Sequence, residues 1–457
     1  MFRCTLPVLC GALLLSGCSH TSYTPPNLPV APGAWRHAPE GGAALSDTWW
    51  RVFASRELDV LVEQALNHNQ DLAAAAARLR QAEAGIRASG APLRPLLDGN
   101  LGASHESRLG GSGEAVGSRY GGGLAASYEV DLWGRLAADH EAAYAELAAS
   151  RFDRETLRLS MTAVLVDTWL HQVALAERLR LADLNLSNAE RVLATVQARQ
   201  NAGAATPLEL AQQRGLVAEQ RRSREELRQQ ADDIRSSLAV LLGQSAPAAP
   251  SATSLAALQA PELAAGLPSD LLLRRPDLAR AEAQLSAADA NLRAARAALL
   301  PRLSLTAGAT GSAGSLSHVL ADPLYSLTAS LTAPIFDGGA LAAAHDRSAA
   351  RREELLAHYR QRIIDAFADV QTALNAIAGV EARWQAQREV QAQAERALQL
   401  AERRYQAGAD DLLNLLDAQR NLFVAEDQSA QLRLAHLQSG VALARALGGG
   451  WRTAVTP

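Results

Sequence analysis

The sequence contains no lysine: all 44 basic side chains among its 457 residues are arginine. A nucleotide-binding P-loop uses a lysine to contact phosphates, and Schiff-base or pyridoxal chemistry needs an amine, so these classes of protein are excluded. There are 48 acidic residues and the net charge is −4, which argues against a nucleic-acid-binding protein. Aromatic residues make up only 4% of the chain although 48% is hydrophobic, which favours long helices with thin apolar seams.

Cysteine is also scarce, because Cys4, Cys10 and Cys18 all lie within the first 18 residues. This segment has a basic start and a short apolar run, a pattern typical of a signal peptide over residues 1–17. Its end, Leu-Ser-Gly-Cys (15–18), resembles the lipobox of bacterial lipoproteins, which implies acylation of Cys18, for example with palmitate. An ordinary signal peptide with an incidental cysteine is the alternative. After cleavage no thiol except that of Cys18 remains, so disulfides and cysteine-based catalytic or metal sites are excluded.

Residues for catalysis or metal binding form no recognisable group. The ten histidines are scattered, and neither a His-Glu-x-x-His nor a Gly-x-Ser-x-Gly motif occurs. We interpret His68 and His171 as residues of helix surfaces rather than as metal ligands. The sequence therefore predicts a protein that is not an enzyme and that has no cofactor and no metal site.

Most of the chain consists of two copies of one unit. Asp71-Leu72 corresponds to Asp277-Leu278, and Pro95 to Pro301, both at a separation of 206 positions. Later landmarks, among them Leu-Leu-Gly (241–243) and Ala-Leu-Gly (446–448), keep a separation of 205. A separation that stays constant to within one residue along the chain indicates a tandem duplication. We divide the chain into a signal peptide (1–17), a lipid-anchored extended tether (18–47), a first repeat (48–243), a linker (244–264), a second repeat (265–448) and a C-terminal tail (449–457).

Each repeat contains two segments in which apolar and small polar residues alternate, which is the period of a β-strand. In the second repeat Leu303 and Leu305 alternate with Ser304 and Thr306. A length of about ten residues suits a tilted transmembrane strand. Strands are predicted at about 96–106, 119–131, 301–310 and 325–334.

Each repeat also contains a long stretch without proline, at about 135–200 and 340–406. At 1.5 Å per residue, a helix of about 66 residues reaches roughly 100 Å, far more than a globular core needs. Turns at Ala202-Gly203 and Ala407-Gly408 reverse the chain into return helices. Shorter helices, about 56–90 and 269–298, precede the strands.

Four strands are too few to close a barrel, and an open sheet edge is not tolerated in lipid because unpaired backbone groups are costly there. Closure therefore requires other copies of the chain. Three copies would give a twelve-stranded barrel with a lumen, and two or four copies would also close one.

Several runs of residues resemble signatures of the outer-membrane efflux protein family, which includes TolC and OprM. The resemblance spans about residues 45–450, and the lipobox places the chain near the NodT-type lipoproteins of RND efflux systems. It rests on four runs: Ser-Tyr-Glu-Val-Asp-Leu-Trp-Gly-Arg (127–135), Arg-Arg-Pro-Asp-Leu (274–278), Ala-Pro-Ile-Phe-Asp-Gly-Gly (333–339) and Leu-Leu-Asp-Ala-Gln-Arg (415–420).

This resemblance implies a mostly α-helical, TolC-like fold with a transmembrane β-barrel, in which two tandem repeats form a homotrimer with twelve strands and a periplasmic α-helical barrel. The implied function is that of the outer-membrane exit duct of a tripartite efflux system, of the kind that gives multidrug resistance. The implied partners are a periplasmic adaptor protein, an inner-membrane RND or ABC pump and outer-membrane lipid, and no nucleic acid.

The resemblance also points to candidate residues of a periplasmic gate beside the reversing turns. Arg404, Tyr405 and Asp417 match residues that link neighbouring coils, Leu413 matches an apolar plug, and Glu209 matches an acidic partner in the first repeat. The alternative for the neighbouring acidic residues 410 and 411 is that they cap the return helix.

Three other functions stay open on the sequence. The chain could form the outer-membrane channel of a type I protein secretion system, or a lipid-anchored periplasmic coiled-coil scaffold with small soluble hairpins. A stand-alone diffusion porin is a further alternative, although a porin needs no helices of about 100 Å. The cargo (drugs, metal ions, solvents or protein) does not follow from the sequence.

Overall fold

The structure is a computed structural model that describes residues 28–38, 41–107, 109–110, 117–245, 252 and 254–452. The chain divides into two units, Met1–Val30 and Ala31–Pro457, and every helix and strand named below belongs to the second. The predicted signal peptide and the lipidation candidate Cys18 lie outside the described residues.

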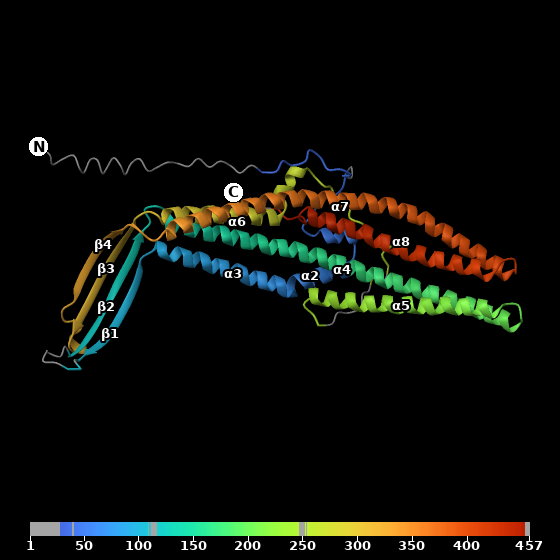
Figure 1. The fold of residues 1–457 in the computed structure, drawn as a ribbon, viewed down its shortest axis with the longest axis horizontal. Helices are drawn as coiled ribbons and strands as arrows, with labels where there is room; N and C mark the ends of the chain where they lie inside the picture. The colour runs from blue at the N-terminus through green and yellow to red at the C-terminus, as the bar shows by residue number, and fades with distance from the viewer. Residues whose placement is uncertain are drawn as a thin grey trace. The chain divides into compact units, whose positions relative to one another are not determined.

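Four antiparallel strands form one sheet, to which each repeat contributes two (Figure 1). Their order in the sheet is their order in the chain, and β1 and β4 pair with no further strand of the described residues. The strands are β1 (Leu96–Glu106), β2 (Gly117–Val130), β3 (Arg302–Ala313) and β4 (Leu324–Thr332).

The strand ends differ by a few residues from those expected. β4 ends at Thr332 rather than at 334 because Pro334 has no N–H with which to continue the ladder. β3 continues to Ala313 because its last residues still pair with β2, where Ala313 lies opposite Tyr120.

The register gives the sheet one apolar and one polar face. Leu303 lies opposite Leu331, whereas Ser304 lies opposite Ser330 and Thr306 opposite Thr328. Successive side chains of a strand point to opposite faces, so the small hydroxyl residues share one face and the leucines share the other.

The two longest helices, α4 (Arg135–Asn201) and α7 (Ala340–Gln406), have 67 residues each. Each begins after a glycine in the left-handed region, Gly134 with φ 72° and Gly339 with φ 88°, where other residues would be strained. The other helical elements are η2 (Trp49–Phe53), α2 (Arg56–His68), α3 (Gln70–Gly90), η3 (Ala91–Leu93), α5 (Pro207–Leu241), η4 (Pro268–Leu273), α6 (Pro276–Ala297), η5 (Leu316–His318) and α8 (Leu412–Ala446).

The helix expected at about 56–90 is divided in two at Asn69. The Asn69 side chain accepts hydrogen bonds from the N–H groups of Asp71 (3.0 Å) and Leu72 (3.1 Å), and thereby caps α3. Its amide also donates to the carbonyl of Leu241 at 3.0 Å. A side chain that forms an N-cap starts a new helix, and here it also ties that helix to the end of α5.

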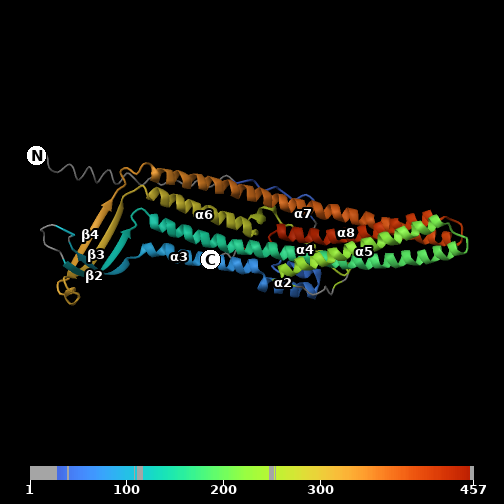
Figure 2. The same cartoon turned by 60° about the horizontal axis from the view of Figure 1, so that its bottom comes forward.

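The helices of the second unit lie side by side. Near the sheet the order is α3, α4, α6, α7, and farther from it α4 pairs with α5 and α7 with α8 (Figures 1 and 2). In the chain, α3 precedes β1 and α4 follows β2, while α6 precedes β3 and α7 follows β4. Each strand is therefore connected at one end to one of these four helices.

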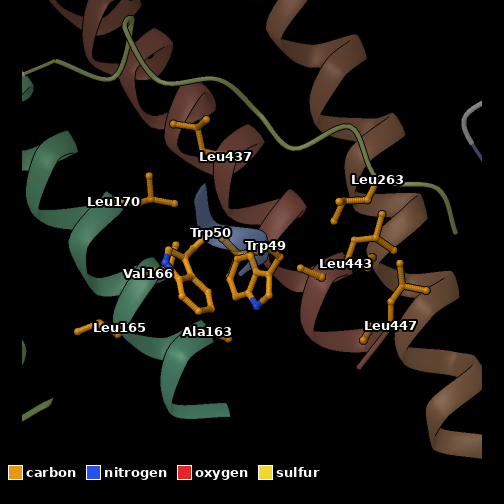
Figure 3. Close-up of a cluster of buried hydrophobic side chains, with 14 of the residues drawn as sticks. Trp49, Trp50, Ala163, Leu165, Val166, Leu170, Leu263, Leu437, Leu443 and Leu447 are labelled. Carbon is orange, nitrogen blue, oxygen red and sulfur yellow. The ribbon is translucent and has the colours of Figure 1, made fainter. Parts of the chain in front are cut away.

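The largest apolar cluster lies midway along the helices. Trp49, Trp50 and Phe53 of η2 are buried, and the two tryptophans pack between α4 and α8 (Figure 3). Residues that we assigned to the linker also contribute, because Leu255 and Leu263 are buried in the same cluster.

Part of the segment expected as an extended tether packs against the helices. Trp35 is buried, its ring lies 6.2 Å from that of Phe367, and Arg36 exchanges two backbone hydrogen bonds with the Gln371 side chain at 3.1 Å. Trp35 and Arg36 are therefore attached to α7.

Candidate functional site

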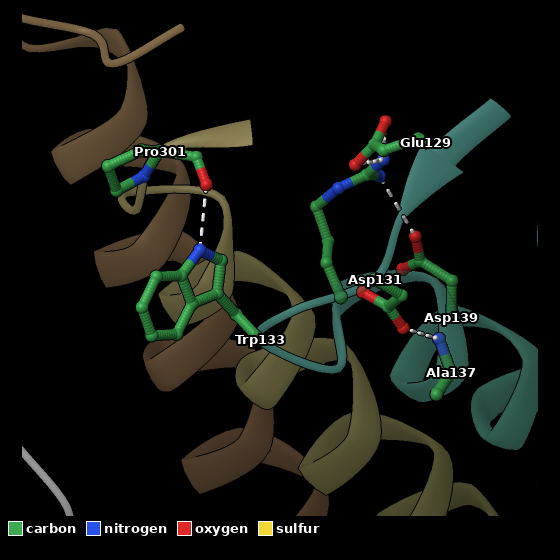
Figure 4. A network of polar contacts seen from close by, with 7 residues as sticks. Glu129, Asp131, Trp133, Ala137, Asp139 and Pro301 are labelled. Atoms are coloured by element: carbon green, nitrogen blue, oxygen red, sulfur yellow. Dashed lines mark hydrogen bonds and ion pairs between the residues drawn. The ribbon is translucent and has the colours of Figure 1, made fainter. Parts of the chain in front are cut away.

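The connection between β2 and α4 is fixed by polar contacts (Figure 4). The Trp133 indole donates to the carbonyl of Pro301 at 2.7 Å, which links the two repeats. Arg135 donates to both oxygens of Glu129 at 2.8 and 2.9 Å and to Asp139 at 3.4 Å. Burial raises the pKa of Asp139 although Arg135 lies beside it. The motif at 127–135 thus ties the end of β2 to the start of α4 and to the second repeat.

The second repeat makes the corresponding connection with a single carboxylate. Asp337 accepts hydrogen bonds from the N–H groups of Gly339 (2.9 Å) and Leu341 (2.8 Å). These two bonds lower the pKa of Asp337, because they favour its charged form. The aspartate therefore caps α7 at the positive end of its dipole.

At the far end of the helices, the turn between α7 and α8 has its own polar network. Arg404 pairs with Asp410 at 3.1 Å, and the Asn414 amide donates to Asp410 at 2.6 Å. The bond from Asn414 and the nearby Arg404 lower the pKa of Asp410. Asp411 accepts from the N–H of Asn414 at 3.2 Å, so it caps α8 as expected in the alternative interpretation.

Tyr405 lies inside the protomer, between the two helical hairpins. It is 3% exposed and packs with Val196 of α4 and with Leu412 and Leu415 of α8. The Arg199 guanidinium lies 4.6 Å from its ring centre and donates to its carbonyl at 2.8 Å. Burial raises the pKa of Tyr405, and its hydroxyl has no hydrogen-bond partner within the described residues.

The other gate candidates lie on the surface of the protomer. Asp417 is 3.9 Å from Arg420 on the same helix, and both side chains are exposed. Leu413 is 52% exposed, whereas its neighbour Leu412 is buried. Glu209 accepts from the N–H and hydroxyl of Thr206 at 2.6 and 2.9 Å, as one half of a capping box that starts α5.

The protomer thus brings Arg404 together with Asp410 and does not bring it together with Asp417. Arg199 is a residue of this region that sequence reasoning missed. The repeat could have indicated Arg199, because it lies 205 positions before Arg404 and is therefore its counterpart in the first repeat. Among the described residues no group of three or more histidines and carboxylates could hold a metal ion.

Comparison with known proteins identifies the kind of molecule that shares this arrangement. The family model for outer membrane efflux proteins matches residues 61–244 and 267–449, one match in each repeat. The pyoverdine export outer membrane protein OpmQ of Pseudomonas putida is 46% identical over 98% of this chain and 97% of its own length. The cation efflux protein CusC of Escherichia coli is 31% identical over 99% of this chain and 100% of its own.

Solved structures agree with the sequence matches. The open state of the Neisseria gonorrhoeae MtrE outer membrane channel has a TM-score of 0.86 and 28% identity, and the alignment covers 94% of this chain and 98% of that one. A crystal structure of CusC has a TM-score of 0.85 and 29% identity, with 93% of this chain and 99% of that one covered.

Proposed function

The chain belongs to the outer membrane efflux protein family, and we propose that three copies of it close their sheets into one twelve-stranded transmembrane barrel. The chain is an outer-membrane efflux channel protein with a TolC-like fold and two structural repeats. The observation that supports the trimer is the sheet itself, whose edge strands β1 and β4 each lack a partner on one side within the described chain. Unpaired strand edges are costly in lipid, and pairing β4 of one copy with β1 of the next removes all of them.

In this assembly the leucine face of the sheet contacts lipid and the serine and threonine face lines the lumen. The helices that continue from the strands extend the same wall into the periplasm as an exit duct. The duct conducts cargo that a periplasmic adaptor and an inner-membrane RND pump deliver, with an ABC pump as the alternative. Acylation of Cys18 anchors each copy to the outer membrane in addition to its strands, and two attachments hold a protein more stably than one.

The cargo that we propose is a small secreted compound of the pyoverdine kind. Relatives from Pseudomonas putida and Pseudomonas aeruginosa that are named for pyoverdine export are 46% and 45% identical to this chain. Relatives named for cation or toluene efflux are 31% and 34% identical. We expect a strain that lacks this protein to retain such a compound inside the cell. Unchanged secretion would exclude the compound as the cargo.

At the tip of the helices we propose that Arg404, Asp417 and the apolar Leu413 form the gate between neighbouring copies. All three are exposed in the protomer and lie beside the turn, where one residue per copy becomes a ring. Tyr405 and Glu209 serve this gate from within the protomer, the first by packing and the second by starting α5.

Conductance in planar lipid bilayers tests the duct and the gate together. We expect the detergent-solubilised protein to migrate as a heat-sensitive trimer and to conduct ions, and Arg404→Ala or Asp417→Ala to raise the single-channel conductance. Arg403→Ala is the matched control, because Arg403 is the exposed neighbour of Arg404. A monomer that never conducts would contradict the duct, and equal conductance of all variants would contradict only the gate.

A further inference from the structure

A groove of about 980 Å³ runs across α3, α4, α6 and α7 beside the base of the sheet. Three acidic residues line it, namely Asp139, Glu146 and Asp153. Arginines from all four helices and from the start of β3 line it too: Arg78, Arg135, Arg280, Arg302, Arg347 and Arg351. Six positive and three negative side chains line the groove, and Glu129 and Glu354 pair with two of the arginines from just outside it. The local excess is therefore one positive charge per protomer, in a chain whose total charge is −4.

The groove lies on the side of α4 that faces away from the tryptophan cluster. Glu146 and Asp153 are two helical turns apart and line the groove, whereas Glu155 lies beside Trp49 and Trp50. An α-helix has 3.6 residues per turn, so Glu155, nine residues after Glu146, points to the opposite side. The two faces of this helical layer therefore carry different surfaces.

The groove also continues the polar face of the sheet. Arg302 is the first residue of β3 and lies opposite Thr332, two residues before Ser304 and four before Thr306. Residues two apart on a strand share a face, so Arg302 lies on the hydroxyl face. This is the face that lines the lumen of the proposed barrel, and the groove is therefore part of the lumen wall.

Some of the groove arginines are paired. Asp153 contacts Arg280 at 2.6 Å and Arg78 at 3.7 Å. Arg135 bonds Asp139 and Glu129, the second of which lies outside the groove lining.

Arg351 also has a partner, since it pairs with Glu354 at 2.5 Å. Arg302 and Arg347 differ, because both are exposed and neither has an ion pair in the part of the chain that the structure describes. Two guanidinium groups that line one groove without a partner are suited to binding carboxylates, since each offers several N–H donors in a fixed plane.

Between the charged side chains, the groove is lined by small residues of α6. Ala287, Ala288, Ala294 and Ala295 of α6 line it, so a bound molecule can approach the helix closely. Ser150 and Asn291 add polar groups that can hydrogen-bond. The lining combines positive charge, hydrogen-bonding groups and space.

We propose that this groove is a binding station for organic anions with more than one carboxylate, and that the duct favours anionic cargo. The proposal deepens the proposed function, since only in the closed trimer do three such grooves face one lumen. Their combined positive charge raises the local concentration of anions in the duct.

Binding of citrate to the full-length, detergent-solubilised protein tests this proposal. We expect isothermal titration calorimetry to show saturable binding of about one citrate per protomer. The double variant Arg302→Gln, Arg347→Gln should bind at least about tenfold more weakly, because two charge-assisted contacts are lost. Raising the salt concentration should also weaken citrate binding to the unmodified protein, because salt screens the attraction between charges.

The matched control is the double variant Arg293→Gln, Arg296→Gln. Both residues are exposed on α6 outside the groove lining, and the control removes the same amount of positive charge. We expect it to bind citrate as the unmodified protein does, and gel filtration shows that each variant is assembled. Absence of citrate binding, or equal weakening in both double variants, overturns the proposal.

The assay separates this inference from the proposed function. A protein that conducts ions in bilayers and does not bind citrate remains a duct without an anion station. A protein that binds citrate through Arg302 and Arg347 and never conducts keeps the station and contradicts the duct. In a conducting protein, we further expect loss of both arginines to shift the zero-current potential in a KCl gradient toward that of potassium.

Discussion

The two helical hairpins, α4 with α5 and α7 with α8, have equal lengths and are held together differently. In the first, Arg224 pairs with Asp183 at 3.0 Å and Arg221 with Glu190 at 2.6 Å, both across the hairpin. In the second, His436 lies 3.5 Å from Glu381 across the hairpin, and burial lowers the pKa of His436. Near its tip, α8 carries a row of buried apolar residues that clusters with α7 and also with both helices of the first hairpin: Leu412, Leu415, Leu416, Leu422 and Phe423.

The second hairpin is also tied to α4 of the first. Arg178 of α4 pairs with Asp427, and Asn185 donates to Glu426 at 3.0 Å. Near the tip, Arg199 packs on Tyr405. Duplication has thus kept the geometry while the polar contacts diverged, and α4 serves both hairpins. Any movement of one hairpin relative to the other has to break these contacts.

The largest effect that we expect comes from Tyr405, the aromatic contact between the hairpins. Replacement by alanine leaves a cavity at a residue that is 3% exposed and should cost about 3–5 kcal/mol of unfolding free energy. Tyr405→Phe should cost almost nothing, because the hydroxyl has no partner within the described chain. Thermal unfolding of the purified trimers measures both. If the phenylalanine variant is as unstable as the alanine variant, the hydroxyl bonds to a neighbouring copy.

The next effect concerns the arginine that joins α4 to α8. Arg178 donates to Asp427 at 2.6 and 3.1 Å, and its side chain is 19% exposed, so Arg178→Ala should destabilise the protein by about 1.5–3 kcal/mol. Arg222→Ala is the control, since Arg222 is exposed and pairs within α5 alone. The denaturant midpoints of the two variants should differ clearly. Equal midpoints would mean that the bond between Arg178 and Asp427 contributes nothing to stability.

The two hairpins also differ in a group whose titration affects stability. Asp167 of α4 is acidic, whereas its counterpart 205 positions later in α7 is Thr372. Burial raises the pKa of Asp167 to about 6, although Arg445 acts in the opposite direction. The folded state therefore binds a proton more tightly than the unfolded state, and stability falls as the pH rises from about 4 through about 6.

We expect Asp167→Asn to remove this pH dependence and to stabilise the protein by about 2 kcal/mol above pH 7. Thermal unfolding at pH 5 and pH 8 measures the change, with Asp232→Asn on the exposed surface of α5 as the control. If the stability of Asp167→Asn still falls with pH as steeply as that of the unmodified protein, another group causes the pH dependence.

The smallest effect separates the buried glutamines of the two return helices. Gln213 donates to the carbonyl of Ala189 at 2.9 Å, whereas neither polar atom of Gln419 has a partner within the described residues, and both side chains are fully buried. Gln213→Met should therefore destabilise by about 1 kcal/mol and Gln419→Met should stabilise by a similar amount. Shifts of equal sign in thermal unfolding would show that Gln419 is bonded in the assembly.

Much of the fold followed from local sequence patterns. The absence of proline over about 135–200 and 340–406 predicted the two long helices, which run from Arg135 to Asn201 and from Ala340 to Gln406. The TolC-like fold class and the efflux function are confirmed by the family match and the solved structures. The break at Asn69 was missed, although its capping bonds to Asp71 and Leu72 are local; only its bond to Leu241 depends on tertiary structure.

The candidate gate was less accessible to sequence reasoning. Arg404 and Tyr405 are adjacent in the chain, yet the first is exposed and pairs with Asp410 while the second is buried against Arg199. Neighbouring positions on a helix point in directions about 100° apart, so sequence proximity does not make them one site.

The sequence by itself determined the duplication, the two long helices, the four strands and the two-faced character of the sheet, since these depend on the spacing of residue types along the chain. Tertiary structure alone decided that α4 holds both hairpins and that arginines from four helices and a strand line one groove. Charges combine through space, and their distances depend on how helices pack rather than on how far apart their residues lie in the chain.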